Sequence, residues 1–244
     1  MRDSPIFVLG LPRSGTTLVQ RVLNADPDVL IQGEQSGAFD LVAKAYRAYC
    51  KDLLARHSQG MPPAEVAENL RTNSWIGNLS TWDIVSLRRM FHCMLMSIGN
   101  PTDREARWGF KEVLFTDNVP EMIFDFYPKA KIILTTRNVT GFVRSMKYKG
   151  WVTTTHQAVE TWNWRMKFIE DISRTHPRRT FAMRYEDMGR KSLGLAMEWA
   201  GVKWTEASDL ALGTLVDATS GNGLTLAETD DVLRFRNPTL TYGA

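Results

Sequence analysis

The chain has 244 residues, of which 43% are hydrophobic and 23% are charged, and its formal net charge is +3. This composition is ordinary for a globular protein with a hydrophobic core. The small positive charge suits an anionic ligand, but it is too weak to indicate a nucleic-acid partner. No apolar run reaches the roughly 18 residues of a membrane span, and the N-terminus lacks the pattern of a secretory signal peptide. We therefore expect one cytoplasmic domain over residues 1–244, with no membrane span and no nucleic-acid partner.

The cysteine content gives no sign of a disulfide framework. Cys50 and Cys93 are the two cysteines, and their separation does not match the spacing of a metal site. We expect both to be buried thiols in a reducing compartment, which agrees with a cytoplasmic location.

The predicted elements begin with a buried strand at residues 6–10, a helix from about 17 to 25 and a short strand at 29–31. Residues of about 36 to 105 are predicted to be mostly helical, with a Leu- and Met-rich helix at 81–97. We interpret this region as a helical insertion within the single domain.

The loop after the first strand has the spacing of a phosphate-binding loop. Gly10 and Gly15 are five residues apart, as in the P-loop, but Thr16 stands where a nucleoside triphosphatase carries Lys. Arg13 supplies a positive charge earlier in the loop. Backbone N–H groups converge at such a strand-to-helix turn, and the helix dipole adds partial positive charge. The segment therefore predicts a phosphate cradle outside the usual ATP or GTP chemistry, with a Gly-rich turn of no function as the alternative.

Strands and helices alternate again from about residue 106. Strands are predicted at 108–113, 131–136 and 180–184, and helices from about 140, at 155–173 and at 192–200. Such alternation is typical of an α/β protein in which a central parallel sheet is flanked by helices on both faces. The polar residues 222–244 are expected to be a loop that folds back over the ligand.

A second group of candidate anion ligands follows the strand at 131–136. Arg137 comes directly after it and Ser145 eight residues later, with Arg144, Lys147 and Lys149 nearby. Parallel sheets bind ligands at the carboxyl ends of their strands, so Arg137 can face the same crevice as the first loop. A guanidinium binds phosphate with two parallel hydrogen bonds, and a Ser hydroxyl donates another. Solvated surface charges are the alternative, whereas two anion sites predict a ligand with two separated phosphate-like groups.

Together these motifs resemble those of sulfotransferases that use 3′-phosphoadenosine 5′-phosphosulfate (PAPS). Residues 11–18 resemble the 5′-phosphosulfate loop of that family, and residues 137–145 resemble its 3′-phosphate motif. Residues 26–34, 184–187 and 201–204 resemble the branch that contains the tyrosylprotein sulfotransferases and bacterial relatives. The resemblance implies a P-loop-like sulfotransferase fold. The helical insertion at 36–105, which the resemblance does not cover, is the expected acceptor side.

The resemblance also implies a set of residues that bind PAPS and its product 3′-phosphoadenosine 5′-phosphate (PAP). These residues are Arg13, Ser14, Gly15, Thr16, Thr17, Arg137, Ser145, Lys149 and Tyr185. The first five would hold the sulfuryl group and the 5′-phosphate, the next three the 3′-phosphate, and the last would contact the nucleoside. Candidates for residues that close over the nucleotide are Ser220, Arg234 and Arg236.

The implied catalytic residues are Glu34, Arg13 and Lys111. Glu34 matches the general base of this branch, and Lys111 matches a Lys that steadies the transferring group. Sulfuryl transfer is an in-line displacement that builds charge on the leaving phosphate oxygen, so positioned cations and N–H donors are the main catalytic devices. A carboxylate can accept the proton of the attacking hydroxyl. The alternatives are a surface or helix-capping role for Glu34 and a structural role for Lys111.

The expected function is transfer of a sulfuryl group from PAPS to a hydroxyl or amine of an acceptor, with no metal. The size of the chain favours a small-molecule acceptor over a peptide, but phenols, sugars, steroid-like alcohols, polyketides, amines and peptide tyrosines all remain open. A P-loop kinase of small molecules and a non-catalytic nucleotide-binding module are the alternative functions. The oligomeric state is not predicted.

Trp162 and Trp164 point about 200° apart on one helix, so we expect one of them to be exposed or to line a pocket.

Overall fold

A computed structural model of the chain describes residues 4–48, 81–99, 106–213 and 226–235. Its centre is a five-stranded sheet with the strand order β2-β3-β1-β4-β5, in which all neighbouring strands are parallel. The strands are β1 (Ile6–Gly10), β2 (Val29–Gln32), β3 (Arg107–Glu112), β4 (Lys131–Thr136) and β5 (Thr180–Arg184). The predicted α/β class with a central parallel sheet is therefore confirmed.

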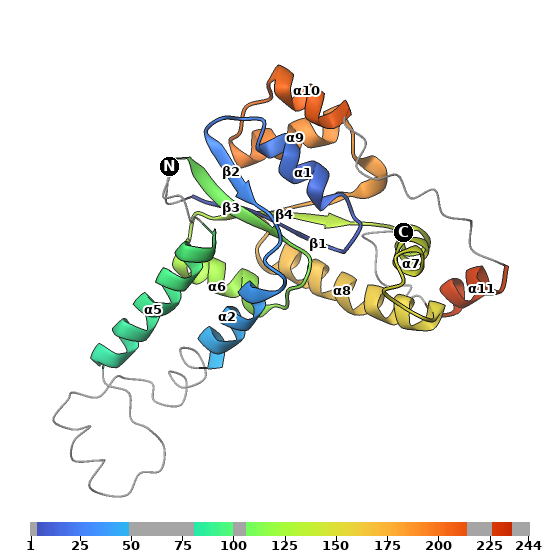
Figure 1. Ribbon diagram of the computed structural model, residues 1–244, viewed down its shortest axis with the longest axis horizontal. Helices are drawn as coiled ribbons and strands as arrows, with labels where there is room; N and C mark the ends of the chain where they lie inside the picture. Colours follow the sequence, from blue (N-terminus) through green and yellow to red (C-terminus); the bar gives the residue numbers. More distant parts are fainter. Residues whose placement is uncertain (1–3, 49–80, 100–105, 214–225, 236–244) are drawn as a thin grey trace, which may run out of the picture.

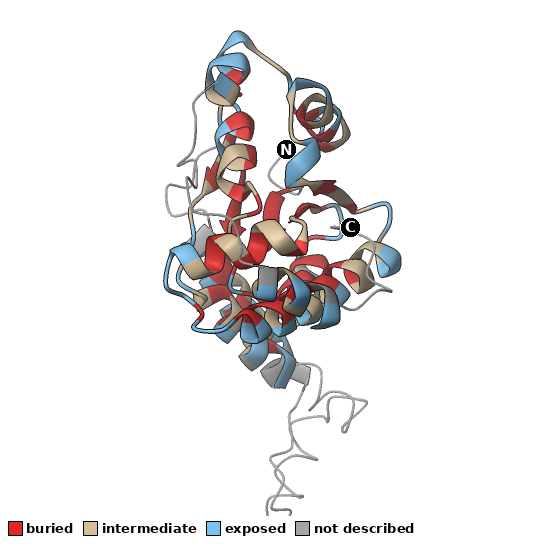
Figure 2. Ribbon diagram, turned by 90° about the vertical axis from the view of Figure 1, so that its right-hand side faces the viewer, coloured by how far each residue is buried: buried red, intermediate tan, exposed pale blue. Residues whose placement is uncertain are grey.

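Helices cover both faces of this sheet (Figure 1). The described helices are α1 (Thr16–Leu23), α2 (Ala38–Tyr46), α5 (Thr81–Gly99), α6 (Asn118–Phe126), α7 (Val139–Tyr148), α8 (Thr155–Thr175), α9 (Arg190–Ala200), α10 (Glu206–Gly213) and α11 (Leu226–Phe235), with a 3₁₀ turn η2 at Tyr185–Asp187. Helices α1, α9 and α10 lie on one face, and α2, α5, α6, α7, α8 and α11 pack on the other. Figure 2 shows that buried residues gather where the helices meet the sheet.

The central strand β1 shows why both faces must be covered. Phe7 and Leu9 enter the core shared with α2, α6 and α8, while Ile6 and Val8 enter the core shared with α1 and α9. Successive strand residues point to opposite faces, and all four of these side chains are fully buried. A continuous apolar run of this kind is typical of a strand inside a parallel sheet.

The parallel topology gathers the loops of the site at one edge of the sheet. Because all five strands run in the same direction, the segments that follow β1, β2, β3, β4 and β5 leave the sheet at their common carboxyl ends. Ligands of open α/β sheets bind in the crevice at this edge. The fold therefore places the loop before α1, residues 33–37, and the starts of α7 and η2 around one region.

The structure corrects some predicted elements. Residues 222–244 were expected to form a loop, but residues 226–235 form helix α11, whose Val232 is buried in the core with α7 and α8. Helices α6 and α10 were not predicted. Cys93 was expected to be buried and is exposed on α5, while Cys50 lies outside the described residues.

The expected helical insertion at 36–105 is described in part. Helices α2 and α5 fall within it and pack with α6 against the sheet, through residues such as Phe39, Phe91 and Leu95. Residues 49–80 and 100–105 lie outside the described part, as do Ser220 and Arg236. Within the residues that the structure describes, no helix combines the length and apolarity needed to cross a bilayer.

Candidate active site

The loop between β1 and α1 has the backbone of an anion cradle. Arg13 and Gly15 adopt left-handed conformations, with φ angles of 64° and 86°. Gly15 immediately precedes α1, and its positive φ is a conformation that favours glycine; a Cβ there would also require the Met188 side chain to move, because it would stand 2.4 Å from Sδ. The first N–H groups of a helix have no partner within the helix. Those of Thr16 and Thr17 therefore begin α1 as donors suited to a phosphate.

Ser14 holds the cradle against the sheet. Its buried hydroxyl lies 2.6 Å from Thr135 Oγ1 and donates to the Leu11 carbonyl at 2.6 Å. Leu11 N–H in turn donates to the Thr135 carbonyl at 3.1 Å. The serine that the resemblance assigns to phosphate binding thus fixes the loop to β4 through its side chain.

The two predicted anion motifs meet in space. Arg13 Nε donates to Ser145 Oγ at 3.1 Å, although the two residues are 132 positions apart. Arg137 Nη1 donates to the Arg13 carbonyl at 2.9 Å. The residues expected at the 5′ and 3′ ends of the donor therefore form one continuous cationic surface.

The Arg137 side chain and backbone are both held in place. Its guanidinium lies 4.4 Å from the centroid of the Tyr185 ring, and its carbonyl accepts a hydrogen bond from the buried indole N–H of Trp162 at 2.9 Å. Burial lowers the pKa of Arg137, and the charges of Arg13 and Arg144 act in the same direction, against those of Tyr185 and Glu186. An arginine nonetheless stays protonated at neutral pH. A partly buried guanidinium near two other cations favours a bound anion.

An open pocket of about 690 Å³ lies beside Arg137. It is lined by Leu18, Arg137, Asn138, Thr140, Gly141, Arg144, Tyr185, Glu186 and Met188. Among the described residues, the Nε atoms of Arg137 and Arg144 are buried without a hydrogen-bond partner. Buried cationic donors without a partner are costly unless a ligand satisfies them. The residues present therefore fit a nucleotide phosphate, and an aromatic ring stands beside them for a nucleoside.

Lys149 is not among the residues that line this pocket. It follows the last turn of α7, is exposed, and its Nζ lies 5.7 Å from the centroid of the Tyr148 ring. The 3′-phosphate role of Lys149 stays a prediction from the resemblance.

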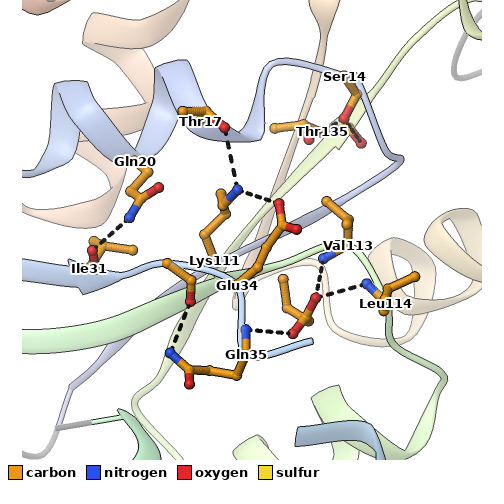
Figure 3. Close-up of polar contacts among 12 residues, drawn as sticks. Ser14, Thr17, Gln20, Ile31, Glu34, Gln35, Lys111, Val113, Leu114 and Thr135 are labelled. Carbon is orange, nitrogen blue, oxygen red and sulfur yellow. Dashed lines mark hydrogen bonds and ion pairs between the residues drawn. The ribbon is translucent and has the colours of Figure 1, made fainter. Parts of the chain in front are cut away.

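The candidate catalytic residues Glu34 and Lys111 come together on the α1 side of the sheet (Figure 3). The Nζ of Lys111 donates to Thr17 Oγ1 at 3.3 Å and forms an ion pair with Glu34 Oε1. The Lys111 side chain is 8% exposed, whereas that of Glu34 is 42% exposed. The lysine thus lies between the phosphate cradle and a carboxylate that is open to solvent.

Several residues that shape the site are not among the predicted site residues. Glu112 is fully buried and accepts hydrogen bonds from the N–H groups of Gln35 and Val113. Glu186 Oε1 accepts from the backbone N–H of Asn138 at 3.0 Å and from its Nδ2 at 2.6 Å. Asn138 also accepts from Gly141 N at 2.7 Å and so caps α7. Trp162 is buried and Trp164 is 53% exposed, so the expectation that one of this pair is exposed is confirmed.

A metal site has no support among the described residues, because no group of three or more His, Cys, Asp or Glu side chains there is arranged to hold an ion.

The parallel sheet, the cradle between β1 and α1 and the cationic edge at β4 define an α/β protein of the P-loop-like class. The chain belongs to the sulfotransferase family, whose sequence profile matches residues 5–206. No curated protein sequence matches the chain significantly.

Solved structures share the fold at low sequence identity. The sulfotransferase domain of the Synechococcus PCC 7002 olefin synthase is 18% identical, with a TM-score of 0.55, covering 98% of this chain and 91% of that domain. Sulfotransferase STF1 from Mycobacterium tuberculosis H37Rv is also 18% identical, with a TM-score of 0.51 and coverages of 94% and 76%. Retinol dehydratase, solved with androsterone and PAP, is 14% identical, with a TM-score of 0.51 and coverages of 96% and 80%.

Proposed function

We propose that the protein transfers the sulfuryl group of PAPS to a hydroxyl or amine of a small-molecule acceptor, with Glu34 as general base. The observation that carries this proposal is the junction of Thr17, Lys111 and Glu34. It puts a buried cation between the helix N-terminus that suits the 5′-phosphate and a carboxylate that an acceptor can reach. The solved relative that holds PAP supports the choice of donor.

The donor-binding half of the mechanism uses the continuous cationic surface. Arg137 and Ser145 would hold the 3′-phosphate, and Tyr185 would contact the nucleoside. The N–H groups at the start of α1 would hold the 5′-phosphate, with Arg13 on the bridging and sulfuryl oxygens. These groups are fixed before the ligand arrives, by bonds such as that from Arg137 to the Arg13 carbonyl, so little reorganisation is needed on binding.

The transfer step is an in-line displacement. The acceptor oxygen or nitrogen forms a bond to sulfur while the bond from sulfur to the 5′-phosphate oxygen breaks, and PAP leaves with that electron pair. Lys111 and Arg13 stabilise the negative charge on the leaving oxygen. Glu34 accepts the proton that the acceptor loses as the new bond to sulfur forms.

The test is replacement of Glu34 by Gln, which keeps the size of the side chain and removes its basicity. We expect kcat for transfer from ³⁵S-labelled PAPS to fall by about 10²–10⁴-fold, the usual contribution of a general base. The acceptor panel contains a phenol, a sugar alcohol, a sterol, a primary amine and a tyrosine peptide.

PAP affinity serves as the control for Glu34→Gln, because Gln keeps a side-chain oxygen that can accept from Lys111, the contact that links Glu34 to the phosphate cradle. We expect the Kd for PAP to change by less than about threefold. A Glu34→Gln protein with full transfer activity would remove Glu34 from the role of base.

A further inference from the structure

Glu112 is a buried carboxylate that the transfer mechanism does not use. It is the last residue of β3, next to Lys111, and it is fully buried. Its Oε1 accepts from Val113 N at 2.9 Å and Leu114 N at 3.0 Å, within the turn that follows the strand. A carboxylate in this position requires hydrogen bonds to offset its removal from water.

The other oxygen of Glu112 reaches a different segment of the chain. Oε2 accepts from Gln35 N at 3.2 Å and from Gly37 N at 3.3 Å (Figure 3 shows the Gln35 contact). These two amides flank Ser36, whose φ of 52° is uncommon for a residue other than glycine. A strained backbone persists only where its surroundings fix it. Glu112 accepts two of the hydrogen bonds that hold the backbone around Ser36 in this conformation.

The segment 33–37 therefore contacts the end of β3 on both faces of the sheet: Glu34 pairs with Lys111, and the amides of Gln35 and Gly37 bond Glu112. Lys111 and Glu112 are neighbours in a strand, so their side chains point to opposite faces of the sheet. Lys111 faces α1, where Glu34 meets it, and Glu112 faces the helix layer of α2 and α8. The chain passes from one face to the other between Glu34 and Gly37.

A positive charge balances the buried carboxylate. Arg165 of α8 donates from Nη1 to the Val113 carbonyl at 2.6 Å, within the turn that Glu112 organises. Burial lowers the pKa of Arg165, while the charges of Asp40 and Glu112 raise it. The arginine thus places a positive charge at the turn held by Glu112, whose two oxygens accept four N–H bonds.

We infer that Glu112 is a positioning residue that sets the place of the general base Glu34 by clamping the Gln35 and Gly37 amides to the end of β3. The effect on catalysis rests on the proposed function, whereas the clamp itself consists of hydrogen bonds to the backbone and does not depend on it. Displacing a catalytic group by about 1 Å costs on the order of 100-fold in rate. A clamp on the adjacent residue therefore has a direct effect on transfer.

The first test is amide hydrogen exchange, which needs no acceptor. In the wild-type protein, residue-resolved exchange should show protection at Gln35 and Gly37. In Glu112→Gln, one oxygen is replaced by an NH₂ group that cannot accept, so exchange over residues 33–37 should speed up by at least about tenfold. Exchange over the cradle at 11–17 should stay unchanged. Unprotected Gln35 and Gly37 amides in the wild type, or unchanged exchange in the variant, would overturn the clamp.

The second test separates positioning from general loss of stability. We expect Glu112→Gln to lower kcat by about 10–100-fold with the Kd for PAP changed less than about twofold. The rate is measured with PAPS and the panel acceptor that the wild type uses, or with water when it uses none. Asp40→Asn is the matched control, because Asp40 is another carboxylate that accepts a backbone N–H from the β3–α6 turn, at Thr116. Its side chain bonds Thr116 and Lys44, and the bond from its backbone N–H to the Gly37 carbonyl stays in place in the variant.

A double-mutant cycle decides how Glu112 acts. If it works through Glu34, the loss from Glu112→Gln should nearly disappear in the Glu34→Gln background. Independent, additive losses would refute the positioning role. A wild type that transfers no sulfuryl group from PAPS at all would end the proposed function, while the exchange experiment would still decide the clamp.

Discussion

At the scale of single residues, the geometry of arginine matters as much as its charge. Arg137 donates from Nη1 to the Arg13 carbonyl, lies over the Tyr185 ring and keeps its Nε directed into a buried region without a described partner. Lysine has one compact ammonium group and cannot make the backbone bond, the ring contact and a phosphate bond together. The site therefore depends on a planar guanidinium at this position.

We predict that Arg137→Lys weakens PAP binding by about 10–100-fold, because a hydrogen bond to a charged group contributes roughly 1.5–3 kcal/mol. Isothermal titration calorimetry with PAP measures the effect. Arg190→Lys is the control, since Arg190 is exposed and pairs with Asp209 on the surface. Equal affinities of Arg137→Lys and the wild type would show that Arg137 does not hold the nucleotide.

At the scale of elements, the Asp40 carboxylate ties helix α2 to the turn after β3. Asp40 accepts from Thr116 N at 2.7 Å and Thr116 Oγ1 at 2.6 Å, and pairs with Lys44 at 2.7 Å. Burial alone would raise the pKa of Asp40, but the hydrogen bonds from Lys44 and Thr116 outweigh it and lower the pKa below 3.8. This contribution to stability is present above the unfolded pKa and is lost as pH falls through the folded one.

We predict that the stability gap between the wild type and Asp40→Asn narrows on acidification. The variant should unfold at lower urea concentration near neutral pH, and the two midpoints should approach each other as the pH falls below about 5. Urea unfolding followed by tryptophan fluorescence at several pH values measures both midpoints. A gap that stays constant over this range would show that the ionised form of Asp40 does not anchor α2.

The elements also show what local sequence can and cannot predict. Strands β1, β2 and β4 were predictable because each is a short, largely apolar run. Helix α11 was not, because its stability comes from contacts distant in sequence: Glu228 pairs with Lys147 of α7, and the Phe235 carbonyl accepts from Asn163 Nδ2 at 2.7 Å. No local pattern within residues 226–235 reports those partners.

The candidate site also has features that local sequence predicts and features that depend on how distant segments come together. The spacing of Gly10 and Gly15 predicts the cradle, and the resemblance predicts the Arg137–Ser145 motif, because each lies within one segment of the chain. The four-amide clamp of Glu112 needs β2 and β3 to be neighbours, which follows from the strand order and not from any local spacing. The bond from Trp162 to the Arg137 carbonyl likewise joins α8 to the end of β4.

At the scale of the whole molecule, the sheet brings two distant anion-binding segments to one edge. The Arg13–Ser145 bond spans 132 positions, and the pocket beside Arg137 combines residues from α1, α7 and η2. A ligand with phosphates at both ends would bridge these elements. Its binding should therefore stabilise the fold as a unit.

The most direct test of this account is a thermal-shift titration with PAP, run beside ATP and AMP, with and without Mg²⁺. At 100 times its Kd, a ligand stabilises the native state by about 2.7 kcal/mol, which corresponds to a rise in Tm of roughly 5–10 °C for a chain of this size. We expect such a rise with PAP, unchanged by EDTA, and a much smaller one with AMP at the same concentration. A rise only with ATP and Mg²⁺, or no rise with PAP, would contradict it.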